Sequence, residues 1–336
     1  MDVLNICATI AVLFLHSSEF SFNYVPNSLR WIISILIQCV FIPAVPIFFM
    51  LSGGNLLNYS QRYSTIIFLK KRFFRTFLPF VFWSVVWFYY HYFSKIRPLW
   101  NKNLVSGILN DQIQPVFWFF YSIFGLYVIT PVLTKIMSIE NKKLIEYMIF
   151  GCLFCTGIVS YFYQIGEKST PILFSSIPIF TSSALFYYLV GWYLKNIRMT
   201  KIQKKTLYIV GVLGAFFMIG LTIILSIHQH KTARSVYTVF GVFAMLYSVA
   251  VYQFIRCQLE NWVPSQKCTL FIRTLSSLSL GIYCVHEFII YYFEDVIKLP
   301  AGSYYHMLVL PVVAYIISAL IVYILKKIPI IRYALP

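Results

Sequence analysis

Residues 2–19 read DVLNICATIAVLFLHSSE, an apolar run that starts after Asp2 and ends at a histidine, His16. The distance from Asp2 to His16 is about 21 Å along a helix that rises ~1.5 Å per residue. This length puts the imidazole near the far boundary of a bilayer, where an ionisable side chain is costly and usually has a function. The stretch therefore predicts a membrane span with a functional histidine near its end, and we expect the other spans to surround that histidine.

The composition of the whole chain is that of a polytopic membrane protein. Of its 336 residues, 60% are hydrophobic and only 11% are charged, whereas soluble domains carry about 25% charged residues. Apolar runs of roughly 20 residues recur along the chain, which is the length that crosses a bilayer as a helix. We therefore predict an all-α fold, a bundle of about ten transmembrane helices. Residues 1–336 form one membrane-embedded domain, and no soluble domain is expected.

The positions of the apolar runs and of the basic residues predict the topology. Basic residues lie in short clusters between the runs, so the net charge of +17 does not indicate a nucleic-acid partner. With the N-terminus in the cytoplasm, 19 of the 27 Lys and Arg residues fall on the cytoplasmic side. This bias predicts a multi-pass protein of the cell membrane with both termini in the cytoplasm. The ten expected spans are 2–18, 32–57, 77–94, 115–134, 144–163, 177–194, 206–227, 236–254, 275–293 and 305–325, and the eight outer basic residues are Arg30, Lys95, Arg97, Lys102, Lys168, Lys231, Arg234 and Lys298.

His16 is the first candidate for chemistry. A histidine at a membrane boundary is often only an interfacial polar residue, and its position alone does not exclude this interpretation. A neutral imidazole could also accept the proton of a hydroxyl, because its unperturbed pKa of about 6.5 lies near the operating pH. Glu19 follows three residues later and would share a helical face with His16, so it could orient the ring.

His286 and Glu287 form a second polar pair, within the expected span 275–293. Burial of such a pair in a bilayer is costly without partners, so both side chains should face the interior of the bundle. The sequence leaves open whether this pair is functional or only forms structural hydrogen bonds.

A third candidate region follows the second span. Ser52-Gly53-Gly54 could break or close-pack the helix and present backbone N–H groups to an anion. The cluster from Lys70 to Arg75 then adds positive charge, which could simply anchor the inner side of the membrane. Alternatively, Arg72 and Arg75, three residues apart and on one face, could bind the phosphates of a cytoplasmic donor. The chain contains no P-loop, no serine-hydrolase elbow and no metal-ligand spacing, so no metal is expected.

Four stretches together resemble the acyltransferase 3 family of integral membrane acyltransferases, over nearly the whole chain. The first is Asp2-Val3-Leu4 leading to His16, and the second is residues 46–53 (PIFFMLSG) with residues 71–79 (KRFFRTFLP). The third is residues 117–121 (FWFFY), which include Trp118, with Leu126, Tyr127 and Pro131, and the fourth is residues 281–286 (GIYCVH). Each motif is loose alone, but their order on a ten-span chain is specific.

The resemblance implies transfer of an acyl group, most often acetyl from cytoplasmic acetyl-CoA, to hydroxyls of cell-surface or lipid-linked glycans. His16 matches the first-span histidine of the family, the expected base or acyl relay. Arg72 and Arg75 match the basic motif that would lie on the donor side with Ser52 and Gly53. No permanently bound cofactor is implied. The expected partners are acyl-CoA, a polysaccharide or lipid-linked glycan, the lipid bilayer and other glycan synthesis or export proteins.

One position departs from the family pattern. The family commonly places Arg or Lys eleven residues before the histidine, where this chain has Asn5. The loss of this charge is consistent with altered donor binding, with a different acyl group, or with loss of the usual transfer. Arg30 is on the wrong side to replace the charge, whereas Arg72 or Arg75 could do so.

The sequence thus predicts an O-acyltransferase that modifies a cell-envelope or exported polysaccharide. The alternative is a membrane component that exports or flips a polysaccharide without acyl transfer, and Asn5 is the residue that raises it. A small-molecule transporter is a weaker third hypothesis, because the chain shows no repeat halves with matched broken helices.

Overall fold

The computed structural model describes residues 1–94, 96–98, 103–175, 180, 182–260, 262–329 and 331–335. Within these ranges the chain is helical and contains no strand, which confirms the predicted all-α class. Lys95 and Lys102, which we assign to the outer side, lie outside the described residues, as do several residues at the start of the predicted span 177–194.

Fifteen α-helices are described. They are α1 (Asp2–His16), α2 (Leu29–Phe41), α3 (Ala44–Leu56), α4 (Thr65–Arg72), α5 (Leu78–Phe93), α6 (Leu104–Leu109), α7 (Trp118–Leu133), α8 (Lys142–Cys152), α9 (Tyr161–Ile165), α10 (Ile172–Ser175), α11 (Ser183–Asn196), α12 (Lys201–Gln229), α13 (Val242–Glu260), α14 (Gln266–Asp295) and α15 (Leu310–Leu325). Short 3₁₀ helices lie at η1 (Glu19–Phe22), η2 (Tyr59–Gln61), η4 (Pro115–Phe117) and η7 (Ile331–Ala334). Wider π-helical turns lie at η3 (Phe73–Phe77), η5 (Leu153–Ser160) and η6 (Tyr305–Val309).

Seven helical segments among the described residues are long and apolar enough to cross a membrane. They are Leu29–Gln61, Pro115–Leu133, Lys142–Ile165, Lys201–Gln229, Val242–Glu260, Gln266–Asp295 and Tyr305–Leu325. The predicted spans 2–18, 77–94 and 177–194 coincide with the shorter helices α1, α5 and α11, of 15, 16 and 14 residues. The chain is therefore a multi-pass membrane protein, but the predicted count of about ten spans is not confirmed.

The predicted span 32–57 is divided into two helices. Helix α2 ends at Phe41 and α3 begins at Ala44, with Pro43 as its N-cap. A proline cannot donate the backbone hydrogen bond that continues a helix, but it is tolerated in the first turn of a new one. The break therefore occurs at Pro43, and α3 can take a direction of its own toward the centre of the bundle.

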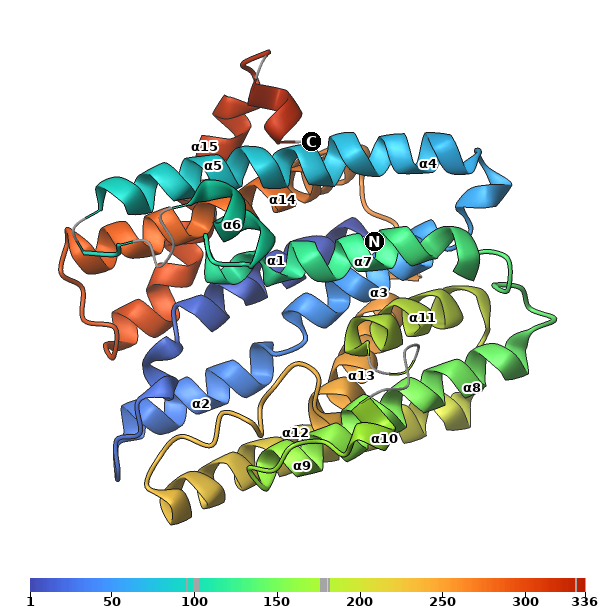
Figure 1. Ribbon diagram of the computed structural model, residues 1–336, viewed down its shortest axis with the longest axis horizontal. Coiled ribbons are helices and arrows are strands. Elements are labelled where there is room, and N and C mark those ends of the chain that lie inside the picture. Colours follow the sequence, from blue (N-terminus) through green and yellow to red (C-terminus); the bar gives the residue numbers. More distant parts are fainter. Residues whose placement is uncertain are drawn as a thin grey trace.

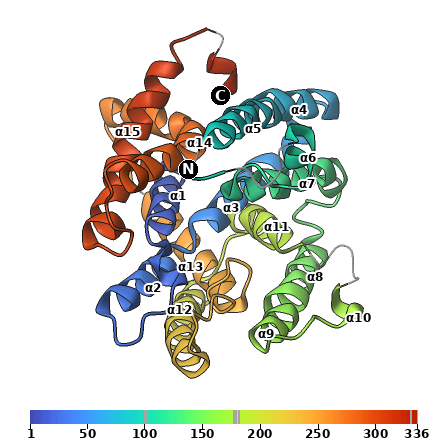
Figure 2. The same cartoon turned by 60° about the vertical axis from the view of Figure 1, so that its left-hand side comes forward.

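Helices α1 and α3 lie in the middle of the bundle (Figures 1 and 2). Helices α5, α14 and α15 lie on one side of this pair, and α8, α9 and α12 lie on the other. Helix α1 packs against α14, α3, α15 and α2, so neighbouring helices cover it from several directions. This central position agrees with the expectation that the rest of the chain surrounds the first span.

Helices α3 and α11 cross in close contact through two glycines. A side chain at Gly53 would overlap the backbone of Tyr188, and one at Gly191 would overlap the backbone of Met50. Small residues allow such close approach of helices in membranes. The Ser52-Gly53-Gly54 segment thus close-packs the helix and does not break it. Because α3 continues through this segment, its backbone N–H groups are bonded within the helix, and the predicted presentation of these groups to an anion is wrong.

Candidate functional site

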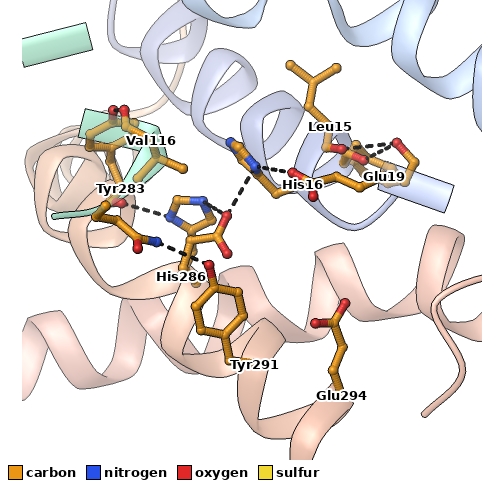
Figure 3. Close-up of polar contacts among 12 residues, drawn as sticks. Leu15, His16, Glu19, Val116, Tyr283, His286, Tyr291 and Glu294 are labelled. Carbon is orange, nitrogen blue, oxygen red and sulfur yellow. Dashed lines mark hydrogen bonds and ion pairs between the residues drawn. The ribbon is translucent and has the colours of Figure 1, made fainter. Parts of the chain in front are cut away.

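His16 is the last residue of α1, and two carboxylates contact its Nδ1 atom (Figure 3). The Oε1 atom of Glu19 lies 3.2 Å from Nδ1, and the Oε1 atom of Glu287 lies 3.1 Å from it. Glu19 begins η1 and so reaches the ring from outside α1, although the predicted contact between the two residues is present. We call His16, Glu19, His286 and Glu287 the His16 cluster.

The two carboxylates determine which nitrogen of His16 carries a proton. A carboxylate oxygen accepts hydrogen bonds, so Nδ1–H is the donor to Glu19, and the Glu287 carboxylate lies beside the same atom as an ion-pair partner. In the neutral ring the proton is therefore on Nδ1, and Nε2 has the free electron pair. A carboxylate that holds Nδ1–H also stabilises the imidazolium formed when Nε2 takes a proton. This arrangement suits His16 to general-base catalysis.

His286 faces His16 from α14, with the ring centroids 5.3 Å apart. Its Nδ1 donates to the backbone oxygen of Tyr283 at 2.8 Å, and its Nε2 lies 3.6 Å from Glu287 Oε1. His286 is fully buried and Glu287 is nearly so, which confirms that this pair faces the bundle interior. The Nε2 atom of His286 has no hydrogen-bond partner among the described residues, so it is able to accept a proton or to bind a cation.

Three side chains of the His16 cluster, those of His16, His286 and Glu287, could together bind a metal ion. One atom each from His16, His286 and Glu287 lies within 4.8 Å of the others. Two imidazoles and one carboxylate form a known ligand set for catalytic zinc. Sequence spacing did not reveal this group, because its members come from the two ends of the chain. In this structure the Nδ1 atom of His16 and the Oε1 atom of Glu287 contact each other directly, at 3.1 Å, as an ion pair.

A polar cavity lies at the other end of α1, which we call the Asn5 end of the bundle, in contrast to the His16 end. This Arg72 cavity has a volume of about 230 Å³ and is lined by Asp2, Asn5, Ser52, Asn55, Arg72 and Ser276, among others. The Asn5 side-chain amide donates to the backbone and hydroxyl oxygens of Ser276, each at 3.0 Å. Asn5 therefore links α1 to α14 at the position where the family commonly has a cation.

Arg72 and Arg75 lie in different surroundings. Arg72 is half-buried, and its buried Nε has no hydrogen-bond partner among the described residues. Its guanidinium carbon lies 5.6 Å from the ring centroid of Tyr127. Arg75 is exposed and is not among the lining residues of the Arg72 cavity. Arg72 is the last residue of α4, whereas Arg75 lies within the π-helical turn η3, whose wider turn changes the relative direction of side chains three residues apart.

A second cavity shares Asn5, Ser52 and Ser276 with the Arg72 cavity and extends along α14 as far as Tyr283. We call it the Tyr283 cavity; its volume is about 260 Å³, and its walls include Asn5, Ser52, Thr76, Ser276 and Tyr283. Along α14, Ser276 and Tyr283 line this cavity, and His286 and Glu287 follow within the next turn. One helix therefore passes from the Arg72 cavity to the histidine that faces His16.

The remaining predicted site residues have different positions. Ser52 lines both the Arg72 and the Tyr283 cavity, whereas Gly53 packs against α11. Trp118 packs its ring against Phe49 and Phe240, with centroids 6.5 and 5.7 Å apart. Trp118 is not among the described residues that line the two cavities, so the structure does not bring it to the candidate site.

Sequence reasoning missed several residues of the site. Ser276 and Tyr283 line the cavities, and Tyr291 lies one turn beyond Glu287 on α14. The run of serines at 276, 277 and 279 at the start of an apolar span was a signal that could have identified the polar wall. Tyr291 carried no such signal, because tyrosine is common near span ends.

A charged network holds the His16 end of the bundle together. Arg97 binds Glu294 at 2.5 Å and Asp295 at 2.7 Å. Although burial lowers the pKa of Arg97, its hydrogen bond to Asp295 and the nearby negative charges raise it above its usual value. His306 contacts Glu294 through Nε2 and the backbone oxygen of Ser17 through Nδ1, at 2.9 and 2.8 Å. This network fixes the residue that directly follows His16.

The fold and the site define an integral membrane protein in which two histidines and two carboxylates meet inside a helical bundle. A family model described as an acyltransferase domain matches residues 1–327 of the chain. The chain therefore belongs to the acyltransferase 3 family, which confirms the resemblance seen in its motifs and makes it a membrane acyltransferase. No curated protein and no solved structure matches the chain in the other two comparisons.

Proposed function

We propose that the protein transfers an acyl group, most simply acetyl, from acyl-CoA to a hydroxyl of a cell-surface or exported polysaccharide, with His16 as the general base. The observation that carries the proposal is the contact of His16 Nδ1 with the carboxylates of Glu19 and Glu287. These contacts leave Nε2 of the same ring as a base within the bundle of an acyltransferase. Helix α14 connects this base to the Arg72 cavity, where the donor would bind.

The charge at the Asn5 end supports binding of acyl-CoA there. The phosphates of CoA need cationic hydrogen-bond donors, and Arg72 has a buried N–H group without a partner at this cavity. The amide of Asn5 and the hydroxyls of Ser52 and Ser276 add uncharged donors and acceptors. The thioester end would extend through the Tyr283 cavity toward His16. Arg72 would then supply the charge that is missing at position 5.

The proposed reaction begins with proton transfer to His16. Nε2 of His16 takes the proton of the acceptor hydroxyl, and the hydroxyl oxygen attacks the thioester carbonyl. Collapse of the tetrahedral intermediate forms the ester and expels the thiolate of CoA, which receives the proton from the imidazolium. Glu287 and Glu19 stabilise the imidazolium, and the surrounding helices keep water away from the thioester. Positioning of donor and acceptor would supply much of the rate.

The proposed setting is the cell membrane, with both termini in the cytoplasm, where acyl-CoA is available. The acceptor would be a polysaccharide or a lipid-linked glycan at the opposite side of the bilayer. Other proteins of glycan synthesis or export are proposed partners, because the acceptor must be made and delivered. No permanently bound cofactor is needed for this reaction.

His16→Ala tests the proposal. We expect loss of ester groups from the surface glycan, since a general base contributes about 10²- to 10⁴-fold in rate. The measurement is the ester content and linkage of glycans from a deletion strain that carries each variant, together with the amount of protein in the membrane. His228→Ala is the matched control, because His228 is an exposed histidine at the end of α12.

Retained acylation in His16→Ala would contradict the assignment of the base. Transport of the polymer with unchanged ester content, insensitive to His16, would instead favour the export alternative. Loss of activity on metal chelation, restored by zinc, would favour a metal site at the His16 cluster.

A further inference from the structure

A third cavity lies at the His16 end of the bundle and has no role in the scheme above. We call it the Asp111 cavity; it has a volume of about 730 Å³. It lies between the end of α5, the segment before η4 and the last turns of α14. Its polar lining includes His91, Arg97, Asp111, Gln114 and Tyr291. This is ample space for a sugar residue, since sites for small molecules have volumes of about 300 to 1,000 Å³.

The basic groups of this cavity already have partners. Arg97 is bound to Glu294 and Asp295, and its guanidinium carbon lies 3.6 Å from the ring centroid of Tyr291. The ring nitrogens of His91 contact the backbone oxygen of Arg97 at 2.8 Å and the side-chain oxygen of Gln114 at 3.0 Å. Among the described lining residues, no cation is left to bind a phosphate or a carboxylate. The cavity therefore favours an uncharged ligand.

Asp111 provides a hydrogen-bond acceptor to which no described residue donates. Its Oδ1 is buried and has no hydrogen-bond partner among the described residues. Burial raises the pKa of this carboxyl group to about 6, so it is mainly ionised at neutral pH despite the cost. A buried acceptor that lacks a donor within the protein is suited to the hydroxyl of a ligand. The backbone of Asp111 has a φ of 54°, which holds the residue in a tight turn.

The cavity is connected to the His16 cluster through α14. Tyr291 lines the cavity and lies four residues after Glu287, on the same side of the helix. The amide of Gln114 donates to the Tyr291 hydroxyl at 3.4 Å, so the opposite wall is tied to this residue (Figure 3). From Ser276 to Tyr291, α14 rises about 22 Å, with the cluster between them. The Arg72 and Asp111 cavities thus lie on either side of the proposed base.

We propose that the Asp111 cavity binds the acyl acceptor, an uncharged and hydroxyl-rich sugar residue, with Asp111 accepting a hydrogen bond from one of its hydroxyls. This inference rests on the proposed acyl transfer. It assigns donor and acceptor to opposite ends of α14. An anionic sugar is disfavoured, because Asp111, Glu294 and Asp295 would repel it.

Saturation-transfer NMR on the full chain in lipid nanodiscs tests the inference without requiring activity. The probes are methyl glucoside, which is neutral, and methyl glucuronide, which is anionic. We expect signal from the neutral probe in the wild type and a loss of affinity of about tenfold in Asp111→Gly, as for a lost hydrogen bond to a charged group. Glycine removes the carboxylate but tolerates the positive φ.

Glu167→Gly is the matched control, since Glu167 is an exposed acidic residue with a φ of 55° in another loop. It should bind the neutral probe as the wild type does. Equal binding by Asp111→Gly and the wild type, or tighter binding of the anionic probe, would overturn the inference. Absence of binding of the neutral probe to the wild type would also count against it.

A second measurement separates this inference from the proposed function. Thiol release from acetyl-CoA is followed with and without methyl glucoside. We expect Asp111→Gly to raise the KM for the sugar about tenfold, whereas the control Glu167→Gly leaves this KM as in the wild type. Complete lack of thiol release by the wild type would contradict the proposed transfer, while the NMR result would still decide whether the cavity binds an uncharged sugar.

Discussion

At the residue scale, the contrast between Arg72 and Arg75 gives a direct test of donor binding. Arg72 lines a cavity and has a buried N–H group without a partner, whereas Arg75 is exposed. Arg72→Ala should raise the KM for acetyl-CoA by about 10- to 100-fold, because charge-assisted hydrogen bonds contribute roughly 1.5–3 kcal/mol. Arg75→Ala should change it by no more than about twofold. Thiol release at varied donor concentration measures both, and equal effects would argue against a separate role for Arg72.

Asp111 should make the stability of the protein depend on pH. Burial raises its pKa in the folded protein from 3.8 to about 6. A carboxyl group whose pKa is raised by folding stabilises the folded state at pH values below its pKa in the unfolded chain, which is 3.8. This contribution to stability is lost as the pH rises through the folded-state pKa of about 6. Asp111→Asn should therefore be more stable than the wild type at pH 8, by roughly 1 kcal/mol after allowance for solvent screening.

The difference should shrink at pH 5, where the wild-type carboxyl group is mostly protonated. Asparagine suits this test because it adopts positive φ values more readily than most residues. Thermal unfolding of both proteins in nanodiscs at the two pH values gives the comparison. A difference that does not change with pH would show that the carboxyl group is not buried as described.

At the element scale, the crossing of α3 and α11 holds Ser52 of α3 in position beside α1. Gly53→Ala should destabilise the protein by about 1–3 kcal/mol, because the added methyl group would overlap the Tyr188 backbone and separate the helices. Gly220→Ala in α12 is the control, since nothing lies within 4 Å of the added methyl group. It should be neutral or slightly stabilising. Melting temperatures of the two variants decide this, and a neutral Gly53→Ala would contradict the close packing.

Local sequence patterns were sufficient to locate most of the helices, but not to predict where a helix is interrupted. The end of α1 at His16 was predicted to within two residues, and each long span overlaps a predicted one, because apolar runs define them. The bounds are less accurate: Gln266–Asp295 begins well before the predicted residue 275, and Val242–Glu260 begins and ends later than the predicted 236–254. The break at Pro43 was not predicted, although proline was visible there, since membrane helices often tolerate proline. The π-turn η3 was also missed, and it is the reason that the predicted common face of Arg72 and Arg75 does not bring both to the cavity.

At the scale of the whole molecule, the basic residues divide between the two ends of the bundle. At the Asn5 end, Lys195 donates to the Asn55 side chain at 2.9 Å and Lys326 to the Ser277 backbone at 3.0 Å. At the His16 end, Arg97 and Lys231 form ion pairs with Asp295 and Glu167. The assignment of the two ends to the two sides of the membrane stays a prediction. Under the proposed function, the Asn5 end would bind the polyanionic donor and the His16 end the uncharged acceptor.

Cysteine labelling tests the orientation. Glu167→Cys should react with a membrane-impermeant maleimide in intact cells, whereas Glu260→Cys should react only after permeabilisation. Both glutamates are exposed in the structure, so accessibility within the protein does not distinguish them. The parent chain, which contains seven native cysteines, gives the background. The reverse pattern would place both termini outside and would contradict a cytoplasmic donor site.

The sequence by itself determined the membrane class, the helical fold and the candidate histidine, because long apolar runs can be satisfied only as helices in a bilayer and an ionisable residue among them is conspicuous. Its motifs also indicated the family. Only the tertiary structure decided which side chains meet. Asn5 contacts Ser276, 271 residues away, and His16 contacts Glu287. Such pairings depend on how helices pack across the whole bundle, and local periodicity contains no information about them.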